Sequence, residues 1–452
     1  MISYYLRSNM NIADYIKTGI NIWPNWVNAF LLRCNIFGPL VYGRAYNTFI
    51  TNIDHIDSVE TLLNITNYAI LHVEYYRKRY NGLKVGSLKE FQENIGFIDK
   101  KEVMDHWEEF LVDNIDWNKC VVMTTGGTSG KPMKLVLPKN RYVHSLAFWH
   151  KELKTYGWNY DARAVIRNHK LPTGRDYMIN PILKEFIFDA FRMDENYAKR
   201  VWTIMNKNGV KYIHAYPSGA YQFLKYCIKQ NLDVSFVKLC ILTSEGVTAE
   251  QRHFIEQELN IPIYSSYGHS EKLIMAGSTP DHATEYSIEE SYGYCELVSD
   301  ENTLINKVGE MGELVGTTFT NRYFPLIRYK TGDYTEYTKF TNEERRIGTI
   351  QGHWDKSIIY RADGGYTSTA VLNLHGEIYE HIDGLQYLQE KKGCLVVMII
   401  PNEKFTIDDE SYLYNHFRNA MGNGGVVEIR IVKNLIIQEN GKFLPLISNV
   451  LN

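Results

Sequence analysis

The sequence predicts an α/β protein with a smaller α+β unit at its C-terminal end. Between residues 212 and 266, short apolar segments alternate with amphipathic ones, a pattern that indicates a parallel sheet flanked by helices. After about residue 290 the pattern changes to a succession of short strands, and about the last 100 residues combine strands with a helix. A length of 452 residues favours two or three domains over one.

The chain up to about residue 115 is expected to be mainly helical. One helix should begin at residue 88, because Ser87 can cap it and Glu90 stands at the capping-box spacing. An apolar run at residues 120–123 then predicts a strand, which leads into a segment rich in glycine and hydroxyl side chains.

The alternating region should begin with a strand at residues 212–216 and a helix at 220–230. A strand at 237–242, a helix at 248–259 and a strand at 263–266 complete the pattern. Because the carboxyl ends of parallel strands meet at one edge of a sheet, the loops that follow these strands should line a ligand crevice.

The β-rich region and the C-terminal unit should add further strands and one helix. The strands are expected at residues 294–298, 312–317, 326–329, 394–400 and 426–432, and the helix at 408–420. We expect a large N-terminal domain over residues 1–352 and a small C-terminal domain over 353–452, with a hinge near Asp355.

Composition excludes several classes of function. Hydrophobic content of 44% and charged content of 22% are typical of a soluble globular protein. A net charge of −3 without a basic run argues against nucleic-acid binding. The most apolar early stretch, residues 26–42, is interrupted by Arg33 and Asn35, so it should not span a bilayer.

The N-terminus lacks the layout of a signal peptide. The six cysteines include no C-x-x-C pair, which favours reduced thiols in a cytoplasmic protein over a zinc site or a disulfide framework.

The segment from Thr124 to Pro132 contains four hydroxyl side chains, three glycines and Lys131. Glycines allow successive backbone N–H groups to point at one spot, and hydroxyls with a lysine suit polyanionic oxygen. It is not a Walker A loop, since that motif needs glycine at position 125 and Ser or Thr at 132. Its composition alone equally fits a mobile surface loop.

Four more polar clusters follow at wide intervals, at residues 244–246, 266–271, 328–333 and 440–442. Three of them come after predicted strands, where a ligand would lie. Each allows a structural alternative: Glu271 suits the first turn of a helix, Asp333 a turn, and Lys442 a hairpin tip after Asn-Gly.

In this order, the clusters resemble those of the adenylate-forming (acyl-CoA synthetase) superfamily. The likeness is greatest to the phenylacetate–CoA ligase branch and its CapK-like relatives in capsular polysaccharide biosynthesis, and it covers nearly the whole chain. Residues 97–101 resemble a segment of that branch upstream of the glycine-rich loop. The resemblance implies a large adenylation domain with mixed or parallel sheets, a β-rich subdomain and a small mobile α+β domain.

The implied reaction has two halves. A carboxylate attacks the α-phosphorus of ATP and pyrophosphate leaves; an acceptor then displaces AMP from the acyl-adenylate. In the resembled family the C-terminal domain rotates between the halves. ATP, Mg²⁺ and a small carboxylic acid are therefore the expected ligands, with CoA as the expected acceptor.

The resemblance also suggests nucleotide-binding residues. Glu245 and Gly246 would border the adenine, Tyr267 would stack on it, and Gly268 would let its backbone approach. The β- and γ-phosphates would be held by Thr125, Thr128, Ser129, Gly130 and Lys131.

Four side chains would act closer to the chemistry. Glu271 would bind Mg²⁺, since a hard cation prefers a carboxylate oxygen, and Asp333 would accept hydrogen bonds from both ribose hydroxyls. Arg328 would lie near the ribose and phosphates. Lys442 would reach from the C-terminal domain to the acyl carboxylate and the α-phosphate. His214 and His269 are expected to pack or line a pocket, because a carboxylate nucleophile needs no base.

Some positions depart from the family pattern. Gly126 stands where Ser is usual, Met133 where Lys or Thr is usual, and His353 where Arg is usual. Residues 276–282 hold a histidine but no cysteine, so we expect no structural zinc of the kind found in relatives.

Other acceptors and another class of function stay open. A carrier protein, a sugar amine or a sugar hydroxyl could replace CoA after the same first half-reaction. Gly126 and His353 motivate a second alternative, a nucleotide-binding scaffold without turnover. The resemblance is also compatible with a homodimer.

Overall fold

The computed structural model describes residues 23–33, 43–124, 133–167, 169–341, 343–350, 358–368, 372, 374, 378, 381–422, 424–436 and 446–450. The chain forms two compact units, each assembled from separate stretches. Unit 1 comprises Met1–Asn47, Gly157–Leu242 and Ala249–Ile263; unit 2 comprises Thr48–Tyr156, Thr243–Thr248 and Tyr264–Asn452. The expected domain boundary after residue 352, with a hinge near Asp355, lies outside the described residues and stays a prediction.

Unit 1 contains the predicted alternation of strands and helices. Its strands follow the order β7-β6-β3-β5-β4, in which β7, β6, β3 and β5 are parallel and β4 is antiparallel to β5. Nearly all residues of β3, β6 and β7 are buried, as expected of parallel strands covered on both faces. The strands are β3 (Arg163–Arg167), β4 (Met178–Asn180), β5 (Glu185–Asp189), β6 (Tyr212–Ala215) and β7 (Leu239–Thr243).

Helices join these strands. α10 (Glu195–Asn208) begins at its cap Asp194 and ends at Gly209, which has a positive φ. α11 (Pro217–Lys229) begins with a proline at its first position, where the missing N–H costs nothing. The remaining helical elements of the unit are α3 (Asn25–Arg33), η5 (Ala190–Arg192), α12 (Ala249–Arg252) and the π-helix η6 (His253–Glu258). The helices predicted at 220–230 and 248–259 correspond to α11 and to α12 with η6, whereas α10 was not predicted.

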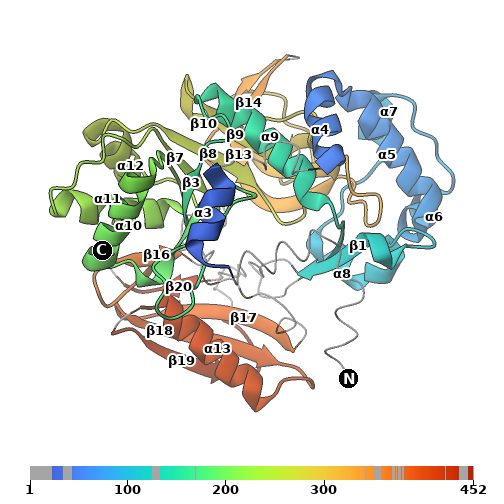
Figure 1. Ribbon diagram of the computed structural model, residues 1–452. Coiled ribbons are helices and arrows are strands. Elements are labelled where there is room, and N and C mark those ends of the chain that lie inside the picture. The colour runs from blue at the N-terminus through green and yellow to red at the C-terminus, as the bar shows by residue number, and fades with distance from the viewer. Residues whose placement is uncertain are drawn as a thin grey trace. The chain divides into compact units, whose positions relative to one another are not determined.

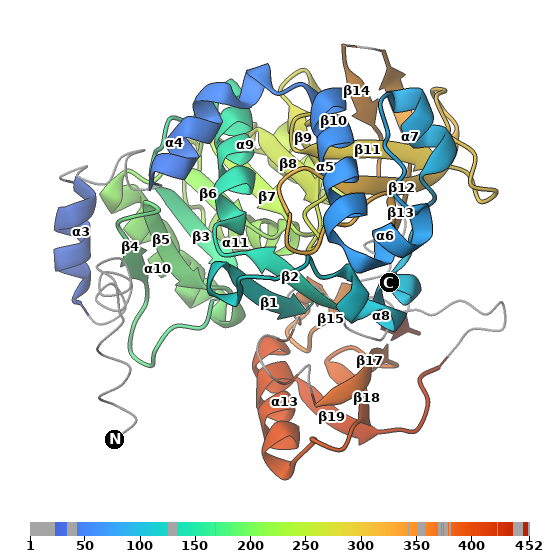
Figure 2. The same ribbon diagram turned by 90° about the vertical axis from the view of Figure 1, so that its right-hand side faces the viewer.

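The N-terminal part of unit 2 is helical, as predicted (Figure 2). The Ser87 side chain accepts a hydrogen bond from the Glu90 N–H, whereas the Glu90 carboxylate accepts from Gly86 rather than from Ser87. Only half of the predicted capping box therefore forms. The elements are α4 (Gly43–Asn52), which begins in unit 1, η2 (Ile53–His55), α5 (Ser58–His72), α6 (Glu74–Tyr80), α7 (Leu88–Asn94), α8 (Lys100–Asp105), η3 (Trp107–Phe110) and η4 (Trp117–Lys119).

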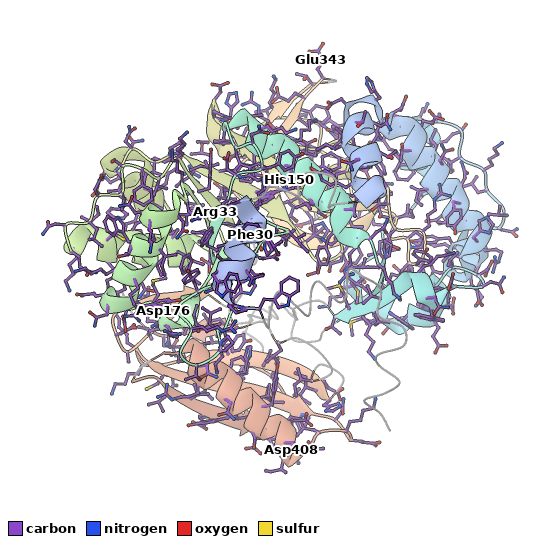
Figure 3. All side chains as sticks on the ribbon, viewed as in Figure 1. Phe30, Arg33, His150, Asp176, Glu343 and Asp408 are labelled. Carbon is purple, nitrogen blue, oxygen red and sulfur yellow. The ribbon has the colours of Figure 1, made fainter. Side chains whose placement is uncertain are left out.

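The sheet of unit 2 follows the order β11-β12-β13-β14-β10-β9-β8, with antiparallel pairing throughout. α9 (Arg141–Thr155) carries the fully buried His150 (Figure 3). A separate hairpin, β1 (Cys120–Thr124) with β2 (Lys134–Pro138), leads into and out of the glycine-rich segment. The sheet strands are β8 (Ile263–Gly268), whose first residue is assigned to unit 1, β9 (Met275–Thr279), β10 (His282–Ile288), β11 (Gly293–Val298), β12 (Met311–Thr318), β13 (Tyr329–Phe340) and β14 (Arg345–Ile347).

One strand prediction is wrong. The strand expected at residues 326–329 begins only at Tyr329, so the cluster 330–333 lies inside β13 instead of after a strand. Arg328 has φ +52° and Gly332 has φ +78°, and the pairing of β12 with β13 shifts register nearby. These left-handed residues bend the chain at a place where its apolar composition suggests a straight strand.

The C-terminal residues of unit 2 form the predicted α+β arrangement. Its sheet follows the order β19-β18-β17-β20, beside which α13 lies (Figure 1), and the ring of Phe417 on α13 lies 5.6 Å from that of Tyr387 on β17. Thr406 and Asp409 cap α13 reciprocally, and Asp408 adds charge to its first turn (Figure 3). The elements are β15 (Ile358–Tyr360), β16 (Tyr366–Ser368), β17 (Ile382–Gln389), β18 (Cys394–Pro401), α13 (Ile407–Ala420), β19 (Val426–Ile431) and β20 (Leu446–Ser448). No described helix of the chain has the length and apolar character needed to cross a membrane.

Candidate active site

The candidate residues that the structure describes all belong to unit 2. Thr243–Thr248 is assigned to this unit although the chain on either side of it belongs to unit 1. The described candidates are Glu245, Gly246, Tyr267, Gly268, Glu271, Arg328 and Asp333. The candidates outside the described residues are Thr125, Thr128, Ser129, Gly130, Lys131 and Lys442, as are Gly126 and His353.

The predicted adenine and ribose contacts meet through a hydrogen bond. The hydroxyl of Tyr267, near the carboxyl end of β8, donates to Oδ2 of Asp333 on β13 over 2.8 Å. Both residues are buried, and burial together with the Asp333 charge raises the pKa of the Tyr267 phenol well above its usual value. Asp333 therefore holds a neutral tyrosine in place with one oxygen.

The segment upstream of the glycine-rich loop packs against the Arg-Tyr-Lys-Thr-Gly-Asp cluster. Ile98 forms a parallel bridge with Tyr329, in which the Ile98 N–H donates to the Arg328 carbonyl over 3.1 Å and the Lys330 N–H donates to the Ile98 carbonyl over 2.9 Å. Two motifs far apart in the sequence thereby become neighbouring strands of backbone, and Lys100 follows directly as the first residue of α8.

Arg328 is buried and bonded to protein groups. Its guanidinium donates two hydrogen bonds of 3.0 Å to the Glu296 carboxylate, and two more to the carbonyls of Gln92 and Ile95. The ring of Phe97 lies 4.0 Å from its central carbon. Four of the five guanidinium donors are occupied in this way, so the geometry supports a positioning role over the expected contact near the nucleotide.

Glu271 is an ionised carboxylate held by a histidine. The N–H of Ile274 donates to Nε2 of His269 over 3.2 Å, so His269 carries its proton on Nδ1 and donates from there to Oε2 of Glu271 over 3.0 Å. Burial acts to raise the pKa of Glu271, but the interaction with His269 and a backbone hydrogen bond, with a smaller contribution from the Lys100 ammonium, outweigh it, and the pKa is lowered. A charged, pre-oriented carboxylate suits a hard divalent cation.

Lys100 is a further charged group that acts on Glu271, and no sequence motif assigns it a role. Burial lowers the pKa of its ammonium to about 8, and the Glu271 charge acts in the opposite direction. Tyr329 connects the same groups, since burial and the charges of Glu271 and Asp333, among others, raise the pKa of its phenol far above its usual range. The charges of Glu271 and Asp333 therefore both act on Tyr329, and the Lys100 ammonium acts on Glu271.

The irregular segment of β13 that carries Asp333 is fixed by Glu313 of β12. The carboxylate of Glu313 accepts from the Gly332 N–H over 2.9 Å and forms an ion pair of 3.2 Å with Lys330. The Thr331 hydroxyl donates to the Leu314 carbonyl over 2.8 Å and accepts from the Asp333 N–H over 3.2 Å. These bonds fix the backbone on both sides of the bulge.

Backbone strain marks the same clusters. Ser244, Lys272 and Arg328 all have positive φ, between +52° and +69°. Residues with side chains adopt this region at a cost of about 1–3 kcal/mol, and such strain gathers at functional sites. Each of the three stands within or next to one of the predicted clusters.

His214 belongs to unit 1, whereas the groups described above belong to unit 2. It lies on β6 in unit 1, where its Nε2 is 3.3 Å from the Arg167 guanidinium and accepts from it. Burial, followed by the charge of Arg167, lowers the pKa of its imidazole well below the usual value.

Among the described residues, no three His, Cys, Asp or Glu side chains gather as a metal site; the absence of zinc stays a prediction.

No protein-family model matches the sequence. The chain is 22% identical over 303 residues to the protein CapK of Staphylococcus aureus. This match covers 63% of this chain and 65% of that protein. It is 34% identical over 130 residues to phenylacetate–coenzyme A ligase of Pseudomonas putida, which covers 28% of this chain and 29% of the ligase. The matches thus span less than two thirds of the length of these relatives.

The fold is similar to that of solved CoA ligases. It matches 2-hydroxyisobutyryl-CoA ligase in complex with 2-HIB-AMP and CoA with a TM-score of 0.55 and 14% identity, over 86% of this chain and 88% of that chain. The same ligase in its postadenylation state gives a TM-score of 0.53 and 13% identity, over 87% and 89%. The predicted fold class is confirmed.

Proposed function

Because the chain belongs to the adenylate-forming superfamily, in its phenylacetate–CoA ligase and CapK-like branch, we propose that it activates a carboxylic acid with ATP and transfers the acyl group to an acceptor. The carboxylate displaces pyrophosphate from ATP and forms an acyl-adenylate. A thiol, with CoA as the first choice, then attacks the acyl carbon and AMP leaves.

The observation that carries this proposal is the hydrogen bond between Tyr267 and Asp333, together with Glu271, whose charge acts on Tyr329 as that of Asp333 does and which is itself influenced by Lys100. An aromatic ring beside a carboxylate suits a nucleoside, because the ring can stack on the base and the carboxylate can accept hydrogen bonds from the ribose hydroxyls. A second carboxylate beside an ammonium suits a metal-bound phosphate. The chemistry of the four side chains therefore fits magnesium-bound ATP, although they come from three distant stretches of sequence.

Asp333 has the properties required of the ribose-binding group. Its Oδ2 is engaged by the Tyr267 hydroxyl, and a carboxylate offers about four lone-pair positions, so acceptor capacity remains for the two ribose hydroxyls. The hydrogen bond also fixes the orientation of the Tyr267 ring, on which the adenine would stack. Glu245 and Gly246 would border the adenine from the strained loop that begins at Ser244.

Glu271 would hold the magnesium ion, which supplies charge neutralisation to the phosphates when it is bound. The chain's own contribution is to keep this carboxylate ionised and oriented through His269. Thr125, Thr128, Ser129, Gly130 and Lys131 would bind the β- and γ-phosphates.

Two lysines would face the developing charge. Lys442 would approach the α-phosphate and the acyl carboxylate from the C-terminal domain, as the family resemblance implies. Lys100 is a second cation close to Glu271, and its ammonium would stabilise the same negative charge from the N-terminal side. Arg328 would act through the backbone it holds, since its donors are bound to Glu296 and to carbonyl oxygens.

A second acceptor class is favoured by one comparison. The match to CapK covers 63% of this chain, whereas the match to the Pseudomonas putida ligase covers 28%. In this alternative the first half-reaction is the same. The acyl group is then transferred to a sugar amine, a sugar hydroxyl or a carrier protein, in a role in polysaccharide biosynthesis.

Product analysis tests the proposal. The full chain is incubated with MgATP and a panel of aryl, hydroxy and amino acids, with and without CoA, and products are identified by mass spectrometry. An acyl-adenylate without CoA and an acyl-CoA with it would support a CoA ligase. An adenylate that CoA does not consume would point to the second acceptor class, and the absence of AMP and adenylate with every acid would favour the scaffold.

A further inference from the structure

Two cations in unit 2 lie against the same aromatic ring. The guanidinium carbon of Arg141 is 4.3 Å from the centre of the Tyr142 ring, and Nζ of Lys272 is 5.2 Å from it. Two like charges held this close repel each other unless an anion lies between or beside them. Tyr142 is 55% exposed, whereas Arg141 and Lys272 are each partly buried beside it.

No carboxylate offsets these charges within the part of the chain that the structure describes. Neither Arg141 nor Lys272 forms an ion pair with a described residue, and Nε of Arg141 is buried without a hydrogen-bond partner there. The Lys272 ammonium donates to the Ser145 hydroxyl over 3.4 Å. With respect to the described residues, the two groups thus keep donors available for a ligand.

The backbone around both residues adds to the positive charge. Arg141 is the first residue of α9, which has no acidic residue in its first turn and no side-chain cap, so a cation stands where the helix dipole disfavours one. Lys272 has φ +57° in a turn closed by its N–H and the His269 carbonyl. A lysine in a strained turn and an arginine at the positive end of a helix are both costly arrangements, and a bound anion would offset that cost.

We propose that Arg141, Lys272 and the Ser145 hydroxyl form a binding site for a phosphoryl group. Two positive charges match a phosphate dianion, whereas a carboxylate would leave one charge unbalanced. The planar guanidinium is suited to paired hydrogen bonds with phosphate oxygens, and the Ser145 hydroxyl, held 2.9 Å from the Tyr292 hydroxyl, supplies a third polar contact.

Two substrates of the proposed reaction carry such a group, and this assignment of the ligand rests on the proposed function. The phosphoryl group is either that of the pyrophosphate half of ATP or the 3′-phosphate of CoA. The cation site itself is independent of acid activation, and a binding measurement without any carboxylic acid tests it separately from turnover.

Isothermal titration calorimetry on the full chain provides the test. The probes are inorganic pyrophosphate, adenosine 3′,5′-bisphosphate and, for comparison, AMP. We expect Arg141→Gln and Lys272→Gln each to weaken binding of one probe by about tenfold or more, since hydrogen bonds to charged groups contribute about 1.5–3 kcal/mol. Loss confined to pyrophosphate assigns the site to ATP, and loss for the bisphosphate but not for AMP assigns it to CoA.

Arg322→Gln is the matched control, because Arg322 also stacks on a tyrosine, Tyr68, at 4.9 Å. It should leave the binding of all three probes unchanged, and Arg141→Lys should retain more affinity than Arg141→Gln. Thermal melts establish that the variants are folded. Wild-type binding of both phosphate probes in Arg141→Gln and Lys272→Gln would overturn the inference, as would an equal loss in Arg322→Gln or no binding of either probe to the wild-type chain.

Discussion

The hydroxyl of Tyr267 donates a hydrogen bond of 2.8 Å to the Asp333 carboxylate, 66 residues further along the chain. This bond joins the two sequence clusters to which the resemblance assigns the adenine and the ribose. Substitutions of the two residues should therefore differ in their effects on ATP binding and on the free energy of unfolding.

Asp333→Asn should weaken ATP binding by about tenfold or more, since an amide offers fewer acceptors to the ribose hydroxyls than a carboxylate does. Tyr267→Phe keeps the aromatic face and should weaken ATP binding less, while it lowers the free energy of unfolding by about 1 kcal/mol through the lost hydrogen bond. Calorimetric titration with ATP and urea unfolding separate the two effects. Equal ATP affinity in Asp333→Asn and the wild type would contradict the ribose assignment.

Glu271→Gln should raise the magnesium concentration needed for half-maximal activity by about tenfold or more, because the neutral amide is a poorer ligand for a hard cation. The measurement is a magnesium titration of AMP formation at saturating ATP. Glu301→Gln, at an exposed residue that accepts from Ser299, should leave the titration unchanged. An unaltered magnesium requirement in Glu271→Gln would remove this residue from the metal site.

Lys100 gives the reaction a pH dependence. With a pKa of about 8, its ammonium is charged below that pH and neutral above it, so kcat/KM should fall as the pH rises through about 8. Lys100→Arg should extend activity to higher pH, because a guanidinium stays charged. Lys101→Arg is the control, since Lys101 is exposed and paired with Asp105, which raises the pKa of its ammonium. A pH profile that Lys100→Arg does not move would exclude Lys100 as the titrating group.

Arg328 should be more important to stability than a surface arginine. Arg328→Ala leaves the Glu296 carboxylate buried and without its partner, and it should lower the free energy of unfolding by about 3–5 kcal/mol. Arg77→Ala removes an ion pair with Asp113 whose side chains are 46% and 41% exposed, and it should cost less than about 1 kcal/mol. Urea unfolding measures both, and comparable losses in the two variants would contradict the positioning role of Arg328.

Local patterns predicted much of the fold. Ser87 caps α7 as its spacing to Glu90 indicates, and the strand and helix at residues 394–420 follow their apolar periodicity closely. The failure at residues 326–329 has a local cause, since the positive φ of Arg328 cannot be inferred from its composition. Propensity describes average backbone preferences and misses a residue held in a strained conformation by its tertiary bonds.

Only those residues of the candidate site that lie in the family's motifs could be predicted from the sequence. Glu271 and Asp333 were found through their motifs, but Lys100 approaches Glu271 because Ile98 pairs with Tyr329, a long-range contact that no sequence pattern signals. The sequence signal for Lys100 is its place in residues 97–101, which resemble a segment of the family. His269 was expected to pack, and its hydrogen bond to Glu271 depends on the turn that brings Ile274 to its other nitrogen.

The central claim is that the chain forms an acyl-adenylate, and carboxylate-dependent exchange of labelled pyrophosphate into ATP measures this step without any acceptor. We predict exchange with at least one acid of an aryl, hydroxy and amino acid panel, and its loss in Lys442→Ala while ATP binding persists. ATP binding without exchange for every acid would contradict the claim, and exchange that survives Lys442→Ala would contradict the role assigned to that lysine.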